Sequence, residues 1–365
     1  MGSANHSDTV IPTLSRLQPL AALGADILRE LAPHCHRERV TRNLDPFQLR
    51  DWQGQVVYLV RGELKLEFAD GVVQVIVGGW GDALYPIGRG RLVPALTKAI
   101  TDVEMLRFDE DLVDIMMTWD QIAAPGQAAP IDSDATDWRT MSGMFTVHSL
   151  TQGVFASMPP ANIEQLLKRF QRVPVKRGEQ IIRQGDPGDF YYLIERGRCA
   201  VTREVAGATV ELAELREGDS FGEEALVADM ARNATVAMKT DGMLLRLGKS
   251  DFMELLREPL LQRLAPAAAQ QRIAAGAQWL DVRFPAEYQC DGLPGAINVP
   301  VNEIRHAVAG LDPAREYIVY CQTGRRSSAA AFLLSQRGLH AHLLDGGLKA
   351  LLATGASNHS NKGLP

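Results

Sequence analysis

Hydrophobic and polar residues alternate in two similar stretches of the chain. "VVYLVRGELKLEF" runs from Val56 to Phe68, and "FYYLIERGRCAVTRE" runs from Phe190 to Glu204. Each stretch consists of an alternating segment, a glycine and a second alternating segment, which is the pattern of two strands joined by a tight turn. The pattern therefore predicts a β-hairpin at both places.

A longer alignment shows that the similarity extends beyond the hairpins. "AITDVEMLRFDEDLVDIM" (Ala99 to Met116) matches "MKTDGMLLRLGKSDFMEL" (Met238 to Leu255) without gaps, at an offset of 139 residues (238 − 99). The hairpins recur at a similar offset, which predicts a domain-sized duplication. In the second copy, glycines separate short strands, a spacing that favours an antiparallel jelly-roll-like barrel. These glycines are Gly178, Gly185, Gly188, Gly197, Gly207, Gly218 and Gly222.

The pattern changes at about Ala265. Short apolar strands such as "QWLDVR" and "EYIVYC" then alternate with helical segments such as "NEIRHAVAGL" and "SSAAAFLLSQRG". Strands that alternate with helices predict an α/β domain with a mostly parallel sheet. The expected fold class is therefore multidomain, with two β barrels and flanking helices (α+β) followed by an α/β domain.

These patterns predict the domain boundaries. A first barrel is expected over 1–123 and a linker over 124–144, which includes the Ala-, Pro- and Asp-rich "APGQAAPIDSDATD". A second barrel is expected over 145–264, the α/β domain over 265–355 and a C-terminal tail over 356–365.

Composition narrows the classes of function. The chain has 365 residues and a formal net charge of −6, which argues against general nucleic-acid binding. No apolar run is long enough to cross a membrane, and the N-terminus lacks the basic-then-apolar order of a secretory signal. The four cysteines show no CxxC or zinc spacing, so we expect no metal site, and free thiols in a reducing cytoplasm.

One of these cysteines, Cys321, ends an apolar strand and opens the loop "CQTGRR". Ser327 and Ser328 are expected to cap the following helix, which Gly338 would close. Loop amides between a strand end and a helix N-terminus converge on an anion, and the helix dipole adds positive potential. With two arginines added, these features favour a reactive thiolate. The candidate catalytic residues are Cys321, Gln322, Thr323, Gly324, Arg325 and Arg326.

From about residue 266 to 352 the chain resembles the rhodanese family. The motifs that match in order are "LDVRFPAEY", "LPGAINVP", "YCQTGRRSS" and "LLDGGL". The resemblance implies that Cys321 carries a persulfide and that Gln322 to Arg326 cradle it. It also implies that Asp281 and Arg283 order the active-site region.

Alternatives at this site remain open. A phosphatase branch of the fold places its arginine after five intervening residues, at Ser327 here, whereas this chain has Arg326 after four. The shorter loop favours sulfur transfer over phosphate hydrolysis. The domain could instead be an inactive scaffold. Cys290 could be a resolving thiol, although a partly buried structural cysteine is the favoured interpretation.

A second motif lies in "GDSFGEEALVADMARNATVAMKTDG", from Gly218 to Gly242. A phosphate requires positive charge and backbone amides, and a ribose hydroxyl requires an acceptor. The segment from about residue 145 to 261 resembles cyclic nucleotide-binding domains. The resemblance implies that Arg232 binds the cyclic phosphate and Glu223 the ribose. The candidate nucleotide-binding residues are Gly222, Glu223, Glu224, Ala225, Arg232 and Asn233.

The first copy lacks this motif. At the same offset, Glu223 falls on Leu84 and Arg232 on Val93. Arg89 and Arg91 could be displaced phosphate ligands, but a solvated loop is favoured. We therefore interpret the first barrel as degenerate and non-binding. In the second barrel, an internal ion pair between Glu223 and Arg232 is the alternative to ligand binding.

Together these motifs predict a cyclic nucleotide-binding regulatory protein with a sulfurtransferase domain. The expected ligand is cAMP or cGMP, with no tightly bound cofactor, and the expected sulfur donor is thiosulfate or a persulfide. A ligand-sensing scaffold with a silent rhodanese domain is the alternative, and association as a homodimer is conceivable. A transcription regulator is disfavoured because no basic helix pair follows the barrel. We also hypothesise that residues 260–273 cover the nucleotide base and couple the two domains.

Overall fold

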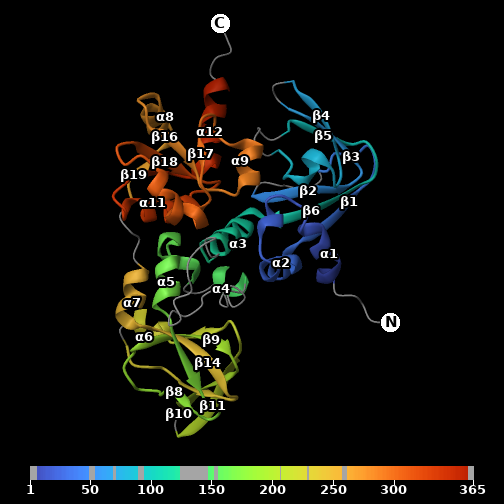
Figure 1. The fold of residues 1–365 in the computed structure, drawn as a ribbon. Coiled ribbons are helices and arrows are strands. Elements are labelled where there is room, and N and C mark those ends of the chain that lie inside the picture. The colour runs from blue at the N-terminus through green and yellow to red at the C-terminus, as the bar shows by residue number, and fades with distance from the viewer. Residues whose placement is uncertain are drawn as a thin grey trace. The chain divides into compact units, whose positions relative to one another are not determined.

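The computed structural model describes residues 6–48, 54–68, 71–88, 94–123, 147–151, 155–205, 207–227, 230–256 and 261–360. The chain divides into two compact units, one formed by 1–122 together with 261–365 and the other by 123–260 (Figure 1). The predicted linker over 124–144 lies outside the described residues, as do Arg89, Arg91 and Val93.

The first unit begins with the helices α1 (His6–Leu14) and α2 (Ala25–Leu31) and a barrel of two three-stranded sheets. One sheet has the order β1-β6-β2 and the other β4-β3-β5, and all their pairings are antiparallel. The helix α3 (Glu110–Ala123) follows the last strand. The strands are β1 (His36–Val40), β2 (Gln55–Arg61), β3 (Glu63–Glu67), β4 (Val73–Val77), β5 (Leu96–Ala99) and β6 (Val103–Asp109).

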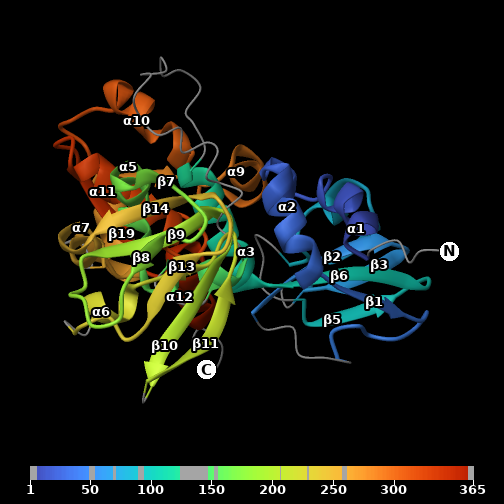
Figure 2. The ribbon, with the colours of Figure 1, turned by 90° about the horizontal axis from the view of Figure 1, so that it is seen from below.

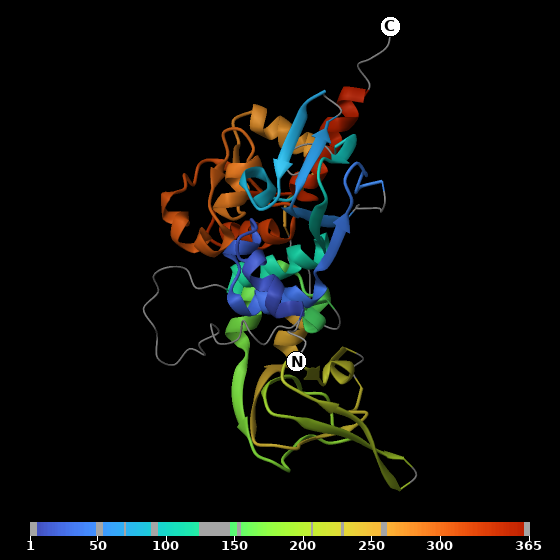
Figure 3. The same ribbon diagram turned by 90° about the vertical axis from the view of Figure 1, so that its right-hand side faces the viewer.

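The second unit contains the helices α4 (Val147–Thr151), α5 (Ile163–Arg169), α6 (Glu223–Val227) and α7 (Lys249–Leu255) and two four-stranded antiparallel sheets. Their orders are β12-β9-β14-β7 and β11-β10-β13-β8, and the β10–β11 hairpin projects from the barrel (Figures 2 and 3). The strands are β7 (Gln171–Val175), β8 (Gln180–Ile182), β9 (Phe190–Arg196), β10 (Cys199–Val205), β11 (Ala208–Leu215), β12 (Ser220–Phe221), β13 (Thr235–Met238) and β14 (Gly242–Gly248).

The two barrels share their strand order, which accounts for the repeat in the sequence. The trio β1-β6-β2 corresponds to β7-β14-β9, and β4-β3-β5 corresponds to β11-β10-β13. Gly62 and Gly197 occupy the same hairpin turn with φ of +86° and +109°. A side chain at Gly62 would place its Cβ 2.3 Å from the Asp102 carbonyl oxygen, so this turn requires glycine in the first barrel.

The C-terminal part of the first unit is a five-stranded sheet of order β15-β19-β18-β16-β17, and every pairing is parallel. Both faces of β18 are buried, which explains its uninterrupted apolar sequence. The strands are β15 (Arg263–Leu264), β16 (Gln278–Asp281), β17 (Ile297–Asn298), β18 (Glu316–Tyr320) and β19 (His340–Leu344); the helices are α8 (Pro266–Ala274), α9 (Pro285–Asp291), α10 (Ile304–Ala307), α11 (Arg325–Ser335) and α12 (Gly347–Ser360).

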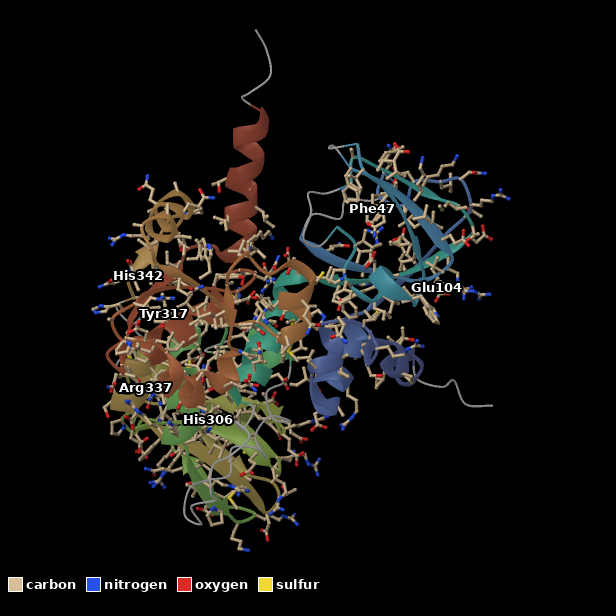
Figure 4. All side chains as sticks on the ribbon, turned by 45° about the horizontal axis from the view of Figure 1, so that its top comes forward. Phe47, Glu104, His306, Tyr317, Arg337 and His342 are labelled. Atoms are coloured by element: carbon tan, nitrogen blue, oxygen red, sulfur yellow. The ribbon has the colours of Figure 1, made fainter. Side chains whose placement is uncertain are left out.

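Side chains of this sheet alternate between two helical layers. Ile318 and Tyr320 belong to a buried cluster with Ala269 of α8 and Leu348 of α12. Tyr317 points to the other face, where its hydroxyl accepts a hydrogen bond from the Asp312 amide at 2.8 Å. Figure 4 labels Tyr317 and His342 on this sheet, and Phe47 and Glu104 in the first barrel.

Several elements begin or end elsewhere than the sequence predicts. The helix after Cys321 begins at Arg325 with Gly324 as its N-cap, so the prediction that Ser327 and Ser328 cap it is wrong. Both serines instead donate hydrogen bonds to carbonyls three residues earlier. The hydroxyl-based cap is not needed because Gly324, at φ +108°, turns the chain directly into the helix.

The chain that follows the second barrel enters the parallel sheet at once. Arg263 and Leu264 form β15, which pairs with β19, and the Asp345 amide donates to the Leu264 carbonyl at 3.0 Å. Residues 263–273, part of the segment hypothesised to cover the nucleotide, are thus built into β15 and α8. At the other end, α12 runs to Ser360, into the range 356–365 that was expected to be a tail. In the described part of the chain, no helix combines the length and hydrophobicity needed to span a membrane.

Candidate functional site

The sulfur atom of Cys321 lies at the start of the loop between β18 and α11. Its side chain is fully buried, and the Gly324 amide donates to Sγ at 3.1 Å. The Ser327 hydroxyl lies 3.4 Å from the same sulfur. α11 has eleven residues, so its N-terminus adds positive potential beside the sulfur. One loop amide is therefore directed at the sulfur, with the Ser327 hydroxyl beside it.

The two loop arginines have carboxylate partners. Arg326 is fully buried and donates to Glu287 at 2.6 and 3.0 Å. Burial alone would lower the pKa of the Arg326 guanidinium, but its interaction with Glu287, Cys321 and Asp114 raises that pKa above its ordinary value. The more exposed Arg325 has its Nε 3.4 Å from the Asp114 carboxylate. Part of the positive charge that the sequence places beside Cys321 is therefore balanced by carboxylates.

Asp281 and Arg283 form a second buried ion pair beside the loop. The guanidinium bonds Asp281 through Nε at 3.0 Å and Nη2 at 2.8 Å, and both side chains are fully buried. Nη1 of Arg283 also donates to Asp291 at 2.8 Å and to the Gln322 side chain at 3.4 Å. The pair thus links the end of β16 to the residue after Cys321, an arrangement suited to ordering the loop.

Residues far away in the sequence complete this site. Asp114 of α3 accepts a hydrogen bond from the Thr323 hydroxyl at 2.5 Å, and Gln121 of α3 accepts one from Arg326 at 3.1 Å. Burial raises the pKa of the Asp114 carboxyl above its usual range, while Arg326, Thr323 and Arg325 oppose that rise. Neither residue carries a motif, and sequence analysis missed both. Glu287 lies within a motif that the sequence analysis quoted, and its place in the first turn of a helix was a usable signal.

Cys290 is exposed on α9, so the expectation of a partly buried structural cysteine is wrong. The helix α9 buries the Glu287 carboxylate, which meets Arg326, whereas Cys290 stays exposed. Cys35 and Cys199 are buried, and burial raises the pKa of their thiols to about 12 and about 11. In the described ranges, no group of three or more His, Cys, Asp or Glu side chains could hold a metal ion.

The second barrel brings all six candidate nucleotide-binding residues to one cavity of about 320 Å³. Arg232 is nearly buried and donates to the carbonyls of Gly222 and Phe190, each at 2.7 Å. Its carboxylate partner is Asp189, at 2.9 Å, rather than Glu223. A Cβ at Gly222 would lie 2.9 Å from Arg232 Nη1, so glycine makes room for this guanidinium. The arginine is therefore oriented by fixed acceptors.

Two acidic residues of α6 face the same cavity. Burial raises the pKa of the Glu223 carboxyl above its usual value, and its Oε2 atom has no hydrogen-bond partner among the described residues. Glu224 accepts a hydrogen bond from the Asn233 side chain. Arg203 of β10 also lines the cavity and donates to the Asn233 carbonyl at 2.8 Å. Sequence analysis missed Arg203, although its alternating strand was predicted.

The corresponding cavity of the first barrel, about 370 Å³, has a different character. A short helical turn, Gly81–Leu84, stands where the second barrel has α6, and Leu84 replaces Glu223. Asp82 accepts a hydrogen bond from Gln74 at 2.5 Å. The described residues that line this cavity include no lysine or arginine: Leu66, Phe68, Val72, Val73, Gln74, Ile76, Asp82, Tyr85, Pro86, Ile87, Gly88 and Cys290. Such a surface offers no cation to a phosphate.

Two family models match the chain, one described as "Cyclic nucleotide-binding domain" over residues 172–258 and the other as "Rhodanese-like domain" over residues 265–354. The chain combines a cyclic nucleotide-binding domain with a rhodanese-like domain. The Arg232 cavity lies within the first match and the Cys321 loop within the second. Together the two matches bear out the resemblances seen in the sequence.

Curated relatives are similar to part of the chain. The cAMP-dependent protein kinase regulatory subunit of Yarrowia lipolytica is 42% identical over 90 residues, which are 25% of this chain and 23% of that protein. The Candida albicans regulatory subunit is 41% identical over 80 residues, 22% of this chain and 17% of that protein. The chain thus spans less than a quarter of the length of these two relatives.

Among solved structures, two that are similar to parts of this chain have low TM-scores. The catabolite activator protein of Thermus thermophilus is 29% identical, covering 33% of this chain and 55% of its own, with a TM-score of 0.27. The regulatory domain of Toxoplasma gondii PKA, solved with cAMP, is 17% identical, covering 70% and 94%, with a TM-score of 0.30.

Proposed function

We propose that the rhodanese-like domain transfers sulfane sulfur through a persulfide on Cys321. The observation that carries this proposal is the Cys321 sulfur, which receives the Gly324 amide at 3.1 Å in a six-residue loop at a helix N-terminus. Such a site stabilises negative charge on sulfur in both the thiolate and the persulfide. The match of residues 265–354 to the rhodanese-like model supports the same chemistry.

The reaction is a pair of displacements at sulfur. The Cys321 thiolate attacks the outer sulfur of thiosulfate, a new S–S bond forms, and sulfite leaves with the electron pair of the broken bond. A nucleophile such as cyanide then takes the outer sulfur, releasing thiocyanate and restoring the thiolate. The loop amide holds the charged sulfur throughout, and the buried Asp281–Arg283 pair supports Gln322 beside it.

Mass spectrometry of peptides from the full-length chain tests this function. We expect incubation with thiosulfate, or with the persulfide of 2-mercaptoethanol, to add one sulfur atom to the peptide that contains Cys321. The exposed Cys290 provides an internal comparison, because a thiol modified by exposure alone would gain sulfur there first. Added sulfur on Cys290 with none on Cys321 would contradict the proposal.

A silent docking module is the second candidate for this domain. The observation in its favour is that both loop arginines are paired, Arg326 with Glu287 and Arg325 with Asp114. A site whose cations are already neutralised attracts an anionic donor less strongly. Absence of sulfur on Cys321 with every donor would favour this candidate.

We further propose that the second barrel binds a cyclic nucleotide, with cAMP as the first ligand to test. Arg232 would contact the phosphate, and the unpartnered Oε2 atom of Glu223 would accept from the ribose hydroxyl. The two relatives named above as cAMP-dependent protein kinase regulatory subunits are 41–42% identical to parts of this chain, which supports the choice of ligand. The first barrel, with Asp82 and apolar side chains in its cavity, would not bind.

Replacing Arg232 with alanine is expected to weaken nucleotide binding by about 1.5–3 kcal/mol, because a charge-assisted contact to phosphate is lost. Isothermal calorimetry with cAMP and cGMP measures this, and the wild-type chain should show no more than one site. Because alanine also frees two buried carbonyls, Arg232→Lys serves as a second variant that keeps the charge. Arg61→Ala, at an exposed position of β2 in the first barrel, is the control. Two equivalent sites in the wild type, or equal affinity in both Arg232 variants and wild type, would refute this assignment.

A further inference from the structure

One face of α3 is turned toward the Cys321 loop, where its side chains accept hydrogen bonds from Thr323 and Arg326. Glu110, Asp114 and Gln121 are spaced four and seven residues apart, so they share that face. Glu110 accepts from Lys349 at 2.6 Å, Asp114 from Thr323 at 2.5 Å, and Gln121 from Arg326 at 3.1 Å. A helix that belongs to the degenerate first barrel therefore presents acceptors directly to the sulfur-transfer loop.

The helix α3 also contributes a carboxylate, and thus negative charge, to the site. Asp114 lies 3.4 Å from Arg325 Nε and 3.9 Å from Arg326 Nη2, and its side chain is 5% exposed. Glu287 supplies the other buried carboxylate to Arg326. Two carboxylates thus oppose the two guanidinium groups of the loop. Since Coulomb energies are larger in a poorly solvated site, a charge on Asp114 acts on any charged group that approaches the loop.

A cavity of about 570 Å³ adjoins the loop where Gln322, Thr323 and Arg326 line it. Among the described residues, its charged lining consists of Glu110, Asp114 and Glu287 against Arg326 and Lys349, so carboxylates outnumber cations there by three to two. The first barrel and α3 form an apolar wall. That wall includes Pro19, Val56, Tyr58, Ile87, Val113 and Met117. The space is suited to an organic group, and its charge disfavours an anionic one.

Resting on the sulfur-transfer function above, we propose that Asp114 is a specificity-determining residue of the Cys321 site. Through its carboxylate, the first barrel makes the site prefer sulfur donors whose substituent is uncharged or cationic over donors with an anionic substituent. The barrel that has lost the phosphate-binding residues thereby acts as one wall of the sulfur-transfer pocket.

The transfer step is the same for every donor. The Cys321 thiolate attacks the outer sulfur of a persulfide anion R–S–S⁻, the Cys321–sulfur bond forms, and R–S⁻ departs with the electron pair of the broken S–S bond. Thiol and persulfide exchange roles, so no further oxidant or reductant is needed. Only the group R differs, and R is the part of the donor that the cavity beside Asp114 would hold.

The experiment compares three donors of similar size in the full-length chain at mildly alkaline pH, which favours the charged form of the Asp114 carboxyl. They are the persulfides of 3-mercaptopropionate (anionic substituent), 2-mercaptoethanol (uncharged) and 2-aminoethanethiol (cationic). Asp114→Asn keeps the shape and an acceptor for Thr323 but removes the charge. We expect kcat/KM to rise about tenfold for the anionic donor, to change by less than about twofold for the uncharged donor, and to fall for the cationic donor.

Two further variants make the result interpretable. Asp111→Asn, at an exposed position of α3, is the matched control and should leave the donor preference unchanged. Glu110→Gln, at a half-buried position of the same cavity, should shift the preference in the same direction as Asp114→Asn, which keeps the test valid if the buried variant does not fold.

The outcomes separate this inference from the function on which it rests. A change in donor preference confined to the Asp114 and Glu110 variants supports the inference. Turnover with an unchanged preference, or an equal loss for all three donors, overturns it while leaving sulfur transfer intact. Absence of turnover with every donor in the wild type overturns the proposed function, and this inference falls with it.

Discussion

Replacing Cys321 with serine should abolish sulfur transfer, lowering turnover by more than about a thousandfold. A serine hydroxyl remains protonated at neutral pH and cannot form the persulfide, so both displacement steps lose their nucleophile. The fold should tolerate the change, because serine is smaller than cysteine and the Gly324 amide can still donate to its oxygen. Release of thiocyanate from thiosulfate and cyanide, or of thiol from an organic persulfide, measures the loss.

The matched control for this experiment is Cys290→Ser. Cys290 is exposed on α9, and its replacement should leave turnover within about twofold of wild type, since it lies outside the hydrogen bonds that surround the Cys321 sulfur. Equal turnover by wild type and Cys321→Ser would show that Cys321 is not the sulfur carrier. Loss of turnover in Cys290→Ser alone would show that the nucleophile is Cys290 on α9.

Glu287→Gln is expected to produce the largest loss of stability, about 3–5 kcal/mol in the free energy of unfolding of the C-terminal sheet region. The change leaves the fully buried Arg326 without the carboxylate that accepts its two short hydrogen bonds. An uncompensated buried guanidinium is costly because a carboxylate no longer offsets the loss of hydration of its charge. Asp114, at 3.9 Å, is too distant to replace both bonds.

Because a chain with several domains does not unfold in one step, hydrogen exchange of peptides from β18 and α11 is the suitable measurement. Faster exchange is expected in those peptides of Glu287→Gln. Asp26→Asn, the same chemical change in an exposed ion pair with Arg29, is the control and should cost less than about 1 kcal/mol. Similar exchange in both variants would mean that the buried pair contributes no more to the free energy of unfolding than a surface pair does.

Local patterns in the sequence predicted much of this molecule. The repeated hairpins around Gly62 and Gly197 predicted two related barrels, and the apolar "YIVY" predicted a strand of the α/β domain; the shared strand order and the burial of that strand on both faces are what the fold adds. The predicted features depend on side-chain period and turn chemistry, which neighbouring residues reveal. The start of α11 was misplaced because Ser327 and Ser328 have cap-forming side chains, whereas a left-handed Gly324 begins the helix.

The partners of the loop arginines could not be predicted in the same way. Asp114 and Thr323 are 209 residues apart, and nothing in "DLVDIMMTW" distinguishes an acid that meets another domain from one in solvent. The carboxylates that balance Arg325 and Arg326 therefore became visible only in the folded chain, together with the cavity that α3 and the loop enclose.

The first unit is built from the two ends of the chain, with residues 123–260 inserted between them. On the ribosome, which delivers the N-terminus first, α3 is made long before its partners Thr323 and Arg326 exist. Asp114, Thr118 and Gln121, all buried in the finished structure, must stay hydrated while some 200 further residues are synthesised. Their polarity allows this face of the newly synthesised barrel to stay hydrated. A run of leucines at the same positions would expose an apolar surface that is prone to aggregation. The polar side chains that α3 directs at the sulfur site thus also allow this helix to remain exposed to solvent until the C-terminal residues have been synthesised.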